Sequence, residues 1–201
     1  MIKTNHQHFK IYKPFGMLSQ MGSNDSKEVR NKRFLGDLYN FPDGIMPVGR
    51  LDEKSEGLLL MTTDGKLSDT INRSGVEKEY YAQLDGEITK AATDHLKTGI
   101  EIGFGGKRYI TKPCEVQKID TPSLLSEADP SLRIGRHRPT SWISIVLIEG
   151  KFRQVRKMTA AVGFPTLRLV RIRIGGITLK DLAPLEVKEI RVSSQDDISD
   201  V

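Results

Sequence analysis

Asp52 is the residue whose sequence neighbours most clearly predict chemistry. It lies in the segment Gly49–Leu60, which reads G-R-L-D-E-K-S-E-G-L-L-L and ends in an apolar run typical of a buried strand. A cation such as Arg50 favours the charged form of a nearby carboxyl group. A carboxylate held ionised can serve as a nucleophile or base without a metal. The simpler interpretation is an Arg–Asp pair on a surface loop, which is common and contributes little.

A second set of reactive side chains lies in the segment Glu149–Met158, which reads E-G-K-F-R-Q-V-R-K-M. We expect a helix over residues 152–162, and the backbone N–H groups at a helix start favour anions. Side-chain donors suited to phosphate groups surround that start: they are Lys151, Arg153, Arg156 and Lys157. Arg153 and Arg156 are three residues apart, so we expect them on one helical face. The simpler interpretation is an amphipathic helix with a solvated basic side.

The elements that must position these segments follow from periodicity and turn residues. We expect strands at 8–13, 58–63, 79–84, 108–119, 142–148 and 167–174, and helices at 66–72, 90–98 and 152–162. The strand at 167–174 alternates an apolar face with a mostly cationic one. Polar residues 19–33 predict a mobile loop, and residues 121–141 form a long connection. Many strands with a few short helices, without βαβ alternation, predict an α+β fold with a mixed, mainly antiparallel sheet.

Charge is segregated along the 201 residues. The formal net charge is +5, every charged residue from Lys151 to Lys180 is basic, and the tail at 195–201 is acidic. A basic stretch of this kind suggests a polyanionic partner, although a solvated face explains it as well.

Cys114 is the one cysteine, so the chain can form neither an internal disulfide nor a thiolate metal site. This composition fits a reducing cytoplasm. The N-terminal residues lack the apolar stretch of a secretory signal, and the apolar runs are too short to span a membrane. We therefore expect a cytoplasmic protein without a membrane segment.

The two segments together resemble the signatures of the pseudouridine synthases that modify ribosomal RNA. G-R-L-D-x-x-S-x-G-L-L matches the first signature, and E-G-[KR]-x-[RH]-Q-[VI]-[RK]-[RK]-M matches the second, about a hundred residues later. Lys13-Pro14, Lys78-Glu79-Tyr80 and the segment 160–175 continue the match, which runs from about residue 10 to 179. Arg153 stands where some relatives have histidine.

This resemblance implies a fold and a set of active-site residues. It makes Asp52 the nucleophile and adds Tyr80 and Arg156 as catalytic residues, with Tyr81 as the alternative if the strand register slips. The substrate-binding residues would be Arg50, Lys151, Arg153, Gln154 and Lys157. Arg50 would either fill the space left by a flipped base or orient the carboxylate. No metal and no cofactor is expected.

The resemblance also implies one catalytic domain over residues 1–201. We expect two lobes around a central cleft, with a core at about 8–192. The first strand begins at about residue 8, so we expect no S4-type RNA-binding domain before it. Members with that organisation modify large-subunit (23S) ribosomal RNA. The expected protein is therefore a monomeric isomerase whose partner is ribosomal RNA.

Three alternatives remain open from the sequence. The chain could be a non-catalytic RNA-binding factor, although Asp52, Tyr80 and Arg156 are all intact. It could be a metal-dependent nuclease using Asp52, Glu53 and Glu56, although a second carboxylate cluster and a histidine pair are missing. It could also perform the same chemistry on another ribosomal uridine or on tRNA.

Overall fold

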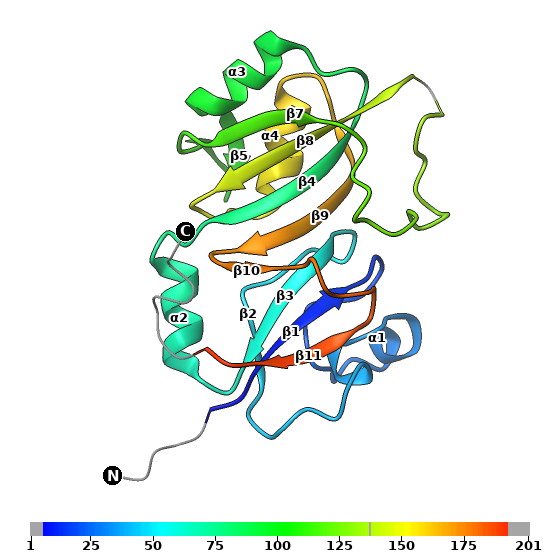
Figure 1. The fold of residues 1–201 in the computed structure, drawn as a ribbon, viewed down its shortest axis with the longest axis vertical. Coiled ribbons are helices and arrows are strands. Elements are labelled where there is room, and N and C mark those ends of the chain that lie inside the picture. Colours follow the sequence, from blue (N-terminus) through cyan, green and yellow to red (C-terminus); the bar gives the residue numbers. More distant parts are fainter. Residues whose placement is uncertain (1–5, 137, 193–201) are drawn as a thin grey trace. The chain divides into compact units, whose positions relative to one another are not determined.

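The computed structural model describes residues 6–136 and 138–192, which fall into two compact units (Figure 1). Unit 1 comprises residues up to 76 and from 173 onward, and unit 2 comprises residues 77–172. The predicted acidic tail at 195–201 lies outside the described residues. No described helix is long and apolar enough to cross a membrane.

Unit 1 is built on an antiparallel sheet. Strand β1 (His8–Lys13) pairs with β11 (Val187–Ile190) and with β3 (Glu56–Thr62), and β3 also pairs with β2 (Met46–Val48). Every residue of β3 is buried, including the polar Glu56 and Thr62 at its two ends. The short strand β10 (Ile177–Thr178) pairs with residues 173 and 174 at the end of β9 (Thr166–Ile174).

The helices of unit 1 begin at residues whose side chains cap them. Asp64 accepts hydrogen bonds from the amides of residues 66 and 67 and so starts α2 (Gly65–Arg73). Asp25 does the same for α1 (Ser26–Asn31), which is followed by a 3-10 turn at Leu35–Asp37. The segment 19–33, predicted as a mobile loop, therefore contains a helix, and that part of the prediction was wrong.

Unit 2 has a sheet in the order β9-β4-β8-β7 and a separate hairpin. Strand β4 (Lys78–Asp85) pairs antiparallel with β8 (Thr140–Leu147), and β8 with β7 (Glu115–Ile119). The hairpin joins β5 (Glu101–Phe104) to β6 (Lys107–Ile110). Residues 108–119, predicted as strands, thus divide between β6 and β7.

The core of unit 2 lies between this sheet and two helices, α3 (Lys90–Thr98) and α4 (Gln154–Ala161). Ala82 and Leu84 of β4 pack in one cluster with Leu96 of α3 and Met158 of α4. The Thr89 hydroxyl caps α3 by accepting from the amide of residue 92, and Gly99, with φ of 93°, ends it. The predicted α+β class with a mainly antiparallel sheet is confirmed.

The predicted cationic face of the strand at 167–174 was wrong. Arg168 and Arg171 are both buried, with 4% and 3% of their surfaces exposed. Arg168 donates to the carbonyl of Ser126 at 2.9 Å, so it ties the long connection before β8 to β9. The basic stretch from Lys151 onward is therefore not one continuous solvated face.

Candidate active site

Asp52 lies on the loop of unit 1 that joins β2 to β3, and this loop is fixed immediately before the carboxylate. The Ser19 hydroxyl donates to the Leu51 carbonyl at 2.7 Å and accepts from the Leu51 amide at 3.0 Å. Both residues are buried. After Asp52, the Ser55 amide closes a turn onto the Asp52 carbonyl at 3.0 Å. The backbone that carries Asp52 is therefore held on both sides.

Lys13 is a second residue that holds this loop in place. Its side chain is fully buried, and its ammonium donates to the carbonyls of Pro14, Met17 and Glu53 at 3.0, 2.7 and 3.4 Å. Burial lowers the pKa of Lys13 to about 7, against the opposing attraction of Glu56, Glu53 and, more weakly, Asp52. Lys13 thus joins the end of β1 to the Asp52 loop and places a titratable cation beside it.

Glu53 completes the attachment of the loop. Its carbonyl also accepts from the Gly16 amide at 2.9 Å, and its carboxylate pairs with Lys32 at 2.8 Å. The Arg33 guanidinium donates to the Phe15 carbonyl at 2.6 Å. The segments before and after α1 therefore support the Asp52 loop.

The carboxylates of this loop are not grouped like metal ligands in the described residues. Across residues 6–136 and 138–192, no three His, Cys, Asp or Glu side chains form a group that could hold a metal ion. The trio Asp52, Glu53 and Glu56 is therefore not such a group. Arg50 is exposed.

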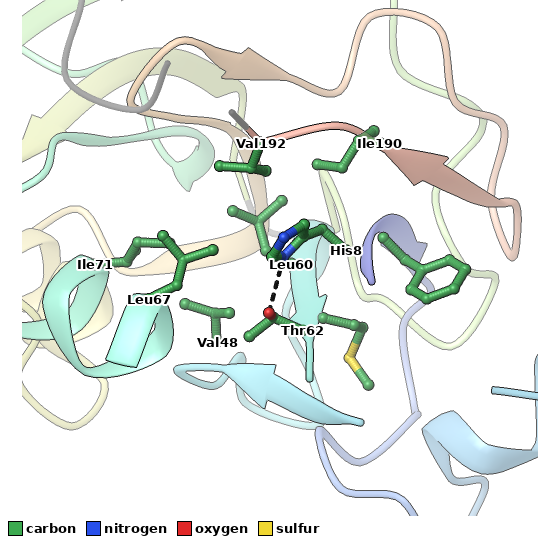
Figure 2. A pocket seen from close by; sticks show the side chains of 10 residues that line it. His8, Val48, Leu60, Thr62, Leu67, Ile71, Ile190 and Val192 are labelled. Atoms are coloured by element: carbon green, nitrogen blue, oxygen red, sulfur yellow. Dashed lines mark hydrogen bonds between the residues drawn. The ribbon is translucent and has the colours of Figure 1, made fainter. Parts of the chain in front are cut away.

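One pocket in the described part of unit 1 is too small to hold a uridine. It lies between β1, β3 and α2, as Figure 2 shows, and has a volume of about 10 Å³, which is close to the space of one water molecule. His8 donates to or accepts from the Thr62 hydroxyl there at 2.9 Å. Burial lowers the pKa of His8. A uridine does not fit in this volume.

Tyr80 lies in unit 2, on the face of β4 that packs against the apolar cluster with α4. It pairs with Ile145 across the sheet, and the Arg171 guanidinium lies 5.9 Å from the centre of its ring. Tyr81 pairs with Ser144 and belongs to the opposite face. The two tyrosines therefore have different surroundings, and Tyr80 shares a packed cluster with the helix that carries Arg156.

Lys78 lies on the same face as Tyr80, two residues earlier. Burial, together with the smaller effect of the nearby Arg171 charge, lowers the pKa of Lys78 to about 8. Arg156 belongs to α4 and donates to the Thr166 carbonyl at 3.1 Å. Unit 2 thus gathers several cations around Tyr80 and the first turns of α4.

The start of α4 is fixed through Glu149 and Gln154. Gln154 donates to the Glu149 carboxylate at 2.7 Å and accepts from the Lys151 amide at 2.9 Å. Glu149 also accepts from the Lys112 amide and from the Tyr109 hydroxyl. Burial acts to raise the pKa of Glu149, but these hydrogen bonds and the Lys151 charge outweigh it and lower the pKa. The loop before α4 is therefore attached to the β5–β6 hairpin.

Arg153 precedes α4 and does not belong to it. It is the N-cap residue and has a left-handed backbone with φ of 56° and ψ of 35°. The predicted helix start at residue 152, with Arg153 and Arg156 on one helical face, was wrong. The Lys157 ammonium donates to the Gly103 carbonyl at 2.7 Å, and the Lys151 ammonium lies 4.8 Å from the centre of the Tyr109 ring.

The structure thus divides the predicted site residues between two groups. Arg50 and Asp52 belong to unit 1, whereas unit 2 carries the others, namely Tyr80, Lys151, Arg153, Gln154, Arg156 and Lys157. Sequence reasoning missed the contributions of Ser19, Lys13 and Arg171. The match of Lys13-Pro14 to the family pattern was the available signal for Lys13.

Comparison with known proteins identifies the family. The model of the RNA pseudouridylate synthase family matches residues 7–161 of this chain. The chain is 40% identical over 184 residues to a ribosomal large subunit pseudouridine synthase E of Vibrio vulnificus, covering 90% of this chain and 74% of that protein. It is 38% identical over 176 residues to the enzyme of the same name from Xanthomonas axonopodis pv. citri, covering 87% and 88%.

A solved structure agrees with these sequence matches. A crystal structure of a pseudouridylate synthase superposes with a TM-score of 0.73 at 25% identity, covering 96% of this chain and 73% of that one. The matched residues 7–161 include the Asp52 loop, Tyr80 and the whole of α4. This chain therefore belongs to the RNA pseudouridylate synthase family.

Proposed function

We propose that this protein converts uridine to pseudouridine in large-subunit ribosomal RNA, with Asp52 as the nucleophile. The observation that carries the proposal is the Asp52 loop, whose backbone is bound by buried Ser19 and Lys13 on either side of a partly exposed carboxylate. A reactive group held on a fixed backbone is what an isomerase needs, because misplacement of a reacting group costs rate. The proposed substrate class comes from the two relatives, which are named as large-subunit enzymes.

The proposed reaction needs no oxidant and no second substrate. The bond between N1 and C1′ of the uridine breaks, the base turns, and a bond forms between C5 and C1′. The proton on C5 leaves and N1 gains one, so atoms and electrons balance. Attack by the carboxylate on C1′, attack on C6, and proton abstraction that gives a glycal would all use the Asp52 side chain. The uridine must first leave its stack, at a cost of a few kcal/mol.

The proposal assigns Tyr80 and Arg156 to the reaction as well. Tyr80 is supported by the apolar cluster on one side and by buried Arg171 near its ring. Such packing restricts the ring to one position, which suits a group that must meet a flipped base. Arg156 is tethered to Thr166 through one of its nitrogens. Gln154, whose amide is engaged by Glu149 and Lys151, would act by shaping the loop that meets the RNA.

The setting of the proposed reaction follows from its substrate. Ribosomal RNA is a polyanion, and Lys151, Arg153 and Lys157 supply the matching charge beside α4. We infer that the protein works as a monomer in the cytoplasm, where ribosomes assemble. Neither a metal nor a cofactor is part of the proposed mechanism.

The substrate is tested by mapping pseudouridine in RNA from cells with and without the gene. We expect at least one large-subunit site to lose its modification, and purified protein to restore it on a transcript of that region. Transcripts of small-subunit rRNA and of tRNA are the matched controls and should stay unmodified. A lost site in tRNA would contradict the substrate class, and binding without conversion of any transcript would support a non-catalytic RNA-binding factor.

A further inference from the structure

Phe152 is a large apolar side chain that the fold leaves in solvent beside α4. It is 66% exposed, whereas phenylalanine is usually buried. Single exposed apolar residues are common on protein surfaces, so exposure alone does not identify a site. Its surroundings distinguish it from the other exposed apolar side chains.

The loop that carries Phe152 has a fixed conformation. On one side, the Lys151 amide is bound by the buried Gln154 side chain, which Glu149 holds in turn. On the other side, Arg153 adopts a left-handed backbone with φ of 56°. Such a backbone is unfavourable for a residue other than glycine, and it persists only where neighbouring contacts impose it. The ring is therefore presented from a backbone with little freedom.

Cations surround the exposed ring. The Lys157 ammonium lies 5.4 Å from the centre of the Phe152 ring, within the range of a cation–π contact. Lys157 is held in place by the Gly103 carbonyl at 2.7 Å, which takes one of its three donors. Lys151 and Arg153 are the direct sequence neighbours of Phe152. An aromatic face beside fixed cations is the chemistry by which proteins bind single-stranded nucleic acid, because bases stack on the ring while phosphates meet the charges.

We propose that Phe152 stacks on an unpaired base of the RNA substrate while Lys157 contacts an adjacent phosphate. This inference rests on the proposed function, since it takes RNA as the substrate, and it names a specific residue that binds the strand. Stacking contributes affinity without reading sequence. Phe152 would therefore hold the strand near the site, whereas other residues would choose the uridine.

The test compares the binding of two short probes, single-stranded oligouridylate and the same ribose-phosphate chain without bases. Phe152→Ala and Phe152→Leu should both weaken oligouridylate binding roughly 5- to 150-fold, the range expected for one base stack. Phe152→Trp should preserve binding. The slope of log affinity against log salt should not change in any of them, because no charge is removed. Ile110→Ala is the matched control, since Ile110 is also in unit 2 and 71% exposed.

The abasic probe and tryptophan fluorescence distinguish base stacking from attraction between charges. Phe152→Ala should leave binding of the abasic probe unchanged. Trp142 is the one tryptophan of the chain and is buried. The emission of the exposed indole in Phe152→Trp can therefore be distinguished from that of Trp142, and oligouridylate should quench it. Equal loss on both probes, unchanged oligouridylate affinity in Phe152→Ala, or self-association that Phe152→Ala abolishes would overturn the proposal.

The two proposals fail in different ways. If the wild-type protein forms pseudouridine in RNA but Phe152→Ala binds oligouridylate as well as wild type, only the stacking proposal fails. If the wild-type protein neither modifies nor binds RNA, the proposed function fails, and the stacking proposal fails with it.

Discussion

Replacement of Lys13 by methionine should disable the enzyme without unfolding it. Methionine has a similar length and fills the buried space, but it cannot donate to the carbonyls of Met17 and Glu53. Hydrogen bonds from a charged donor contribute about 1.5–3 kcal/mol each. The folded protein no longer has to bury an ammonium group, and this gain offsets part of that loss. We therefore expect a small change in global stability and a large change in the local stability of the Asp52 loop.

The magnitude of the local effect follows from the bond to Glu53, the one of these two carbonyls that lies in the Asp52 loop. Losing about 1.5–3 kcal/mol, the contribution of that one bond, corresponds to roughly 10- to 150-fold easier opening of the loop. The amide of Ser55, which closes the turn at Asp52, should exchange its hydrogen faster by a similar factor. The turnover number should fall roughly 10- to 100-fold, because Asp52 is less often correctly placed. KM should change by less than about threefold, because the RNA contacts near α4 are untouched.

The assay measures the turnover number, KM and hydrogen exchange on the same preparations. Lys10→Met is the matched control, because Lys10 lies in the same strand β1 but pairs with Asp181, away from the Asp52 loop. It should show wild-type turnover and unchanged exchange at Ser55. Wild-type turnover in Lys13→Met, or a loss that tracks global unfolding, would refute the reasoning.

Three further predictions follow from charge and protonation. Burial lowers the pKa of Lys13 to about 7 from 10.5, so between these values the unfolded chain binds a proton that the folded chain has released. Denaturant titrations should therefore show wild type gaining stability relative to Lys13→Met from pH 7 towards 10, with no change below pH 7. Lys157→Gln should reduce the log–log salt slope of RNA binding by roughly 0.7–0.9, the value for one lost contact, and an unchanged slope would exclude Lys157 from phosphate binding. Turnover should survive EDTA on RNA kept folded by monovalent salt, and activity that returns only with a divalent ion would contradict the metal-free mechanism.

Local signals in the sequence were sufficient to predict much of the fold. The helix at 90–98 is bounded by Thr89 and Gly99, and both act as predicted. Helix α1 was missed although Asp25 and Glu28 stand at the spacing of a capping pair, because its six residues include no buried one. Strand β2 was missed because it is three residues long and contains Pro47.

The burial of the arginines in β9 could not be predicted from local patterns. Alternation predicted solvent on the cationic face, but Arg168 is satisfied by the Ser126 carbonyl, 42 residues earlier. Arg171 lies near the ring of Tyr80 on another strand. A buried charge is tolerated only where such partners exist, and these partners come from distant segments.

The candidate site shows the same division between local and distant information. Asp52 was recognised from its own short segment. The support of its loop was not, because the groups that bind it come from Ser19 and Lys13, more than thirty residues earlier. Arg153 was misplaced onto the helix because a left-handed backbone at a non-glycine residue has no local signature.

Release of tritium from RNA labelled at C5 of uridine tests the central claim most directly, because forming the C5–C1′ bond expels the C5 hydrogen into water. On a large-subunit rRNA transcript, wild type should release one equivalent for each modified uridine. Asp52→Asn should bind the RNA and release none above background, since an amide cannot replace the carboxylate nucleophile. Glu53→Gln, the same change at the next residue, should stay within about threefold of wild type, because its amide oxygen can still accept from Lys32. Release by Asp52→Asn within tenfold of wild type would contradict the account.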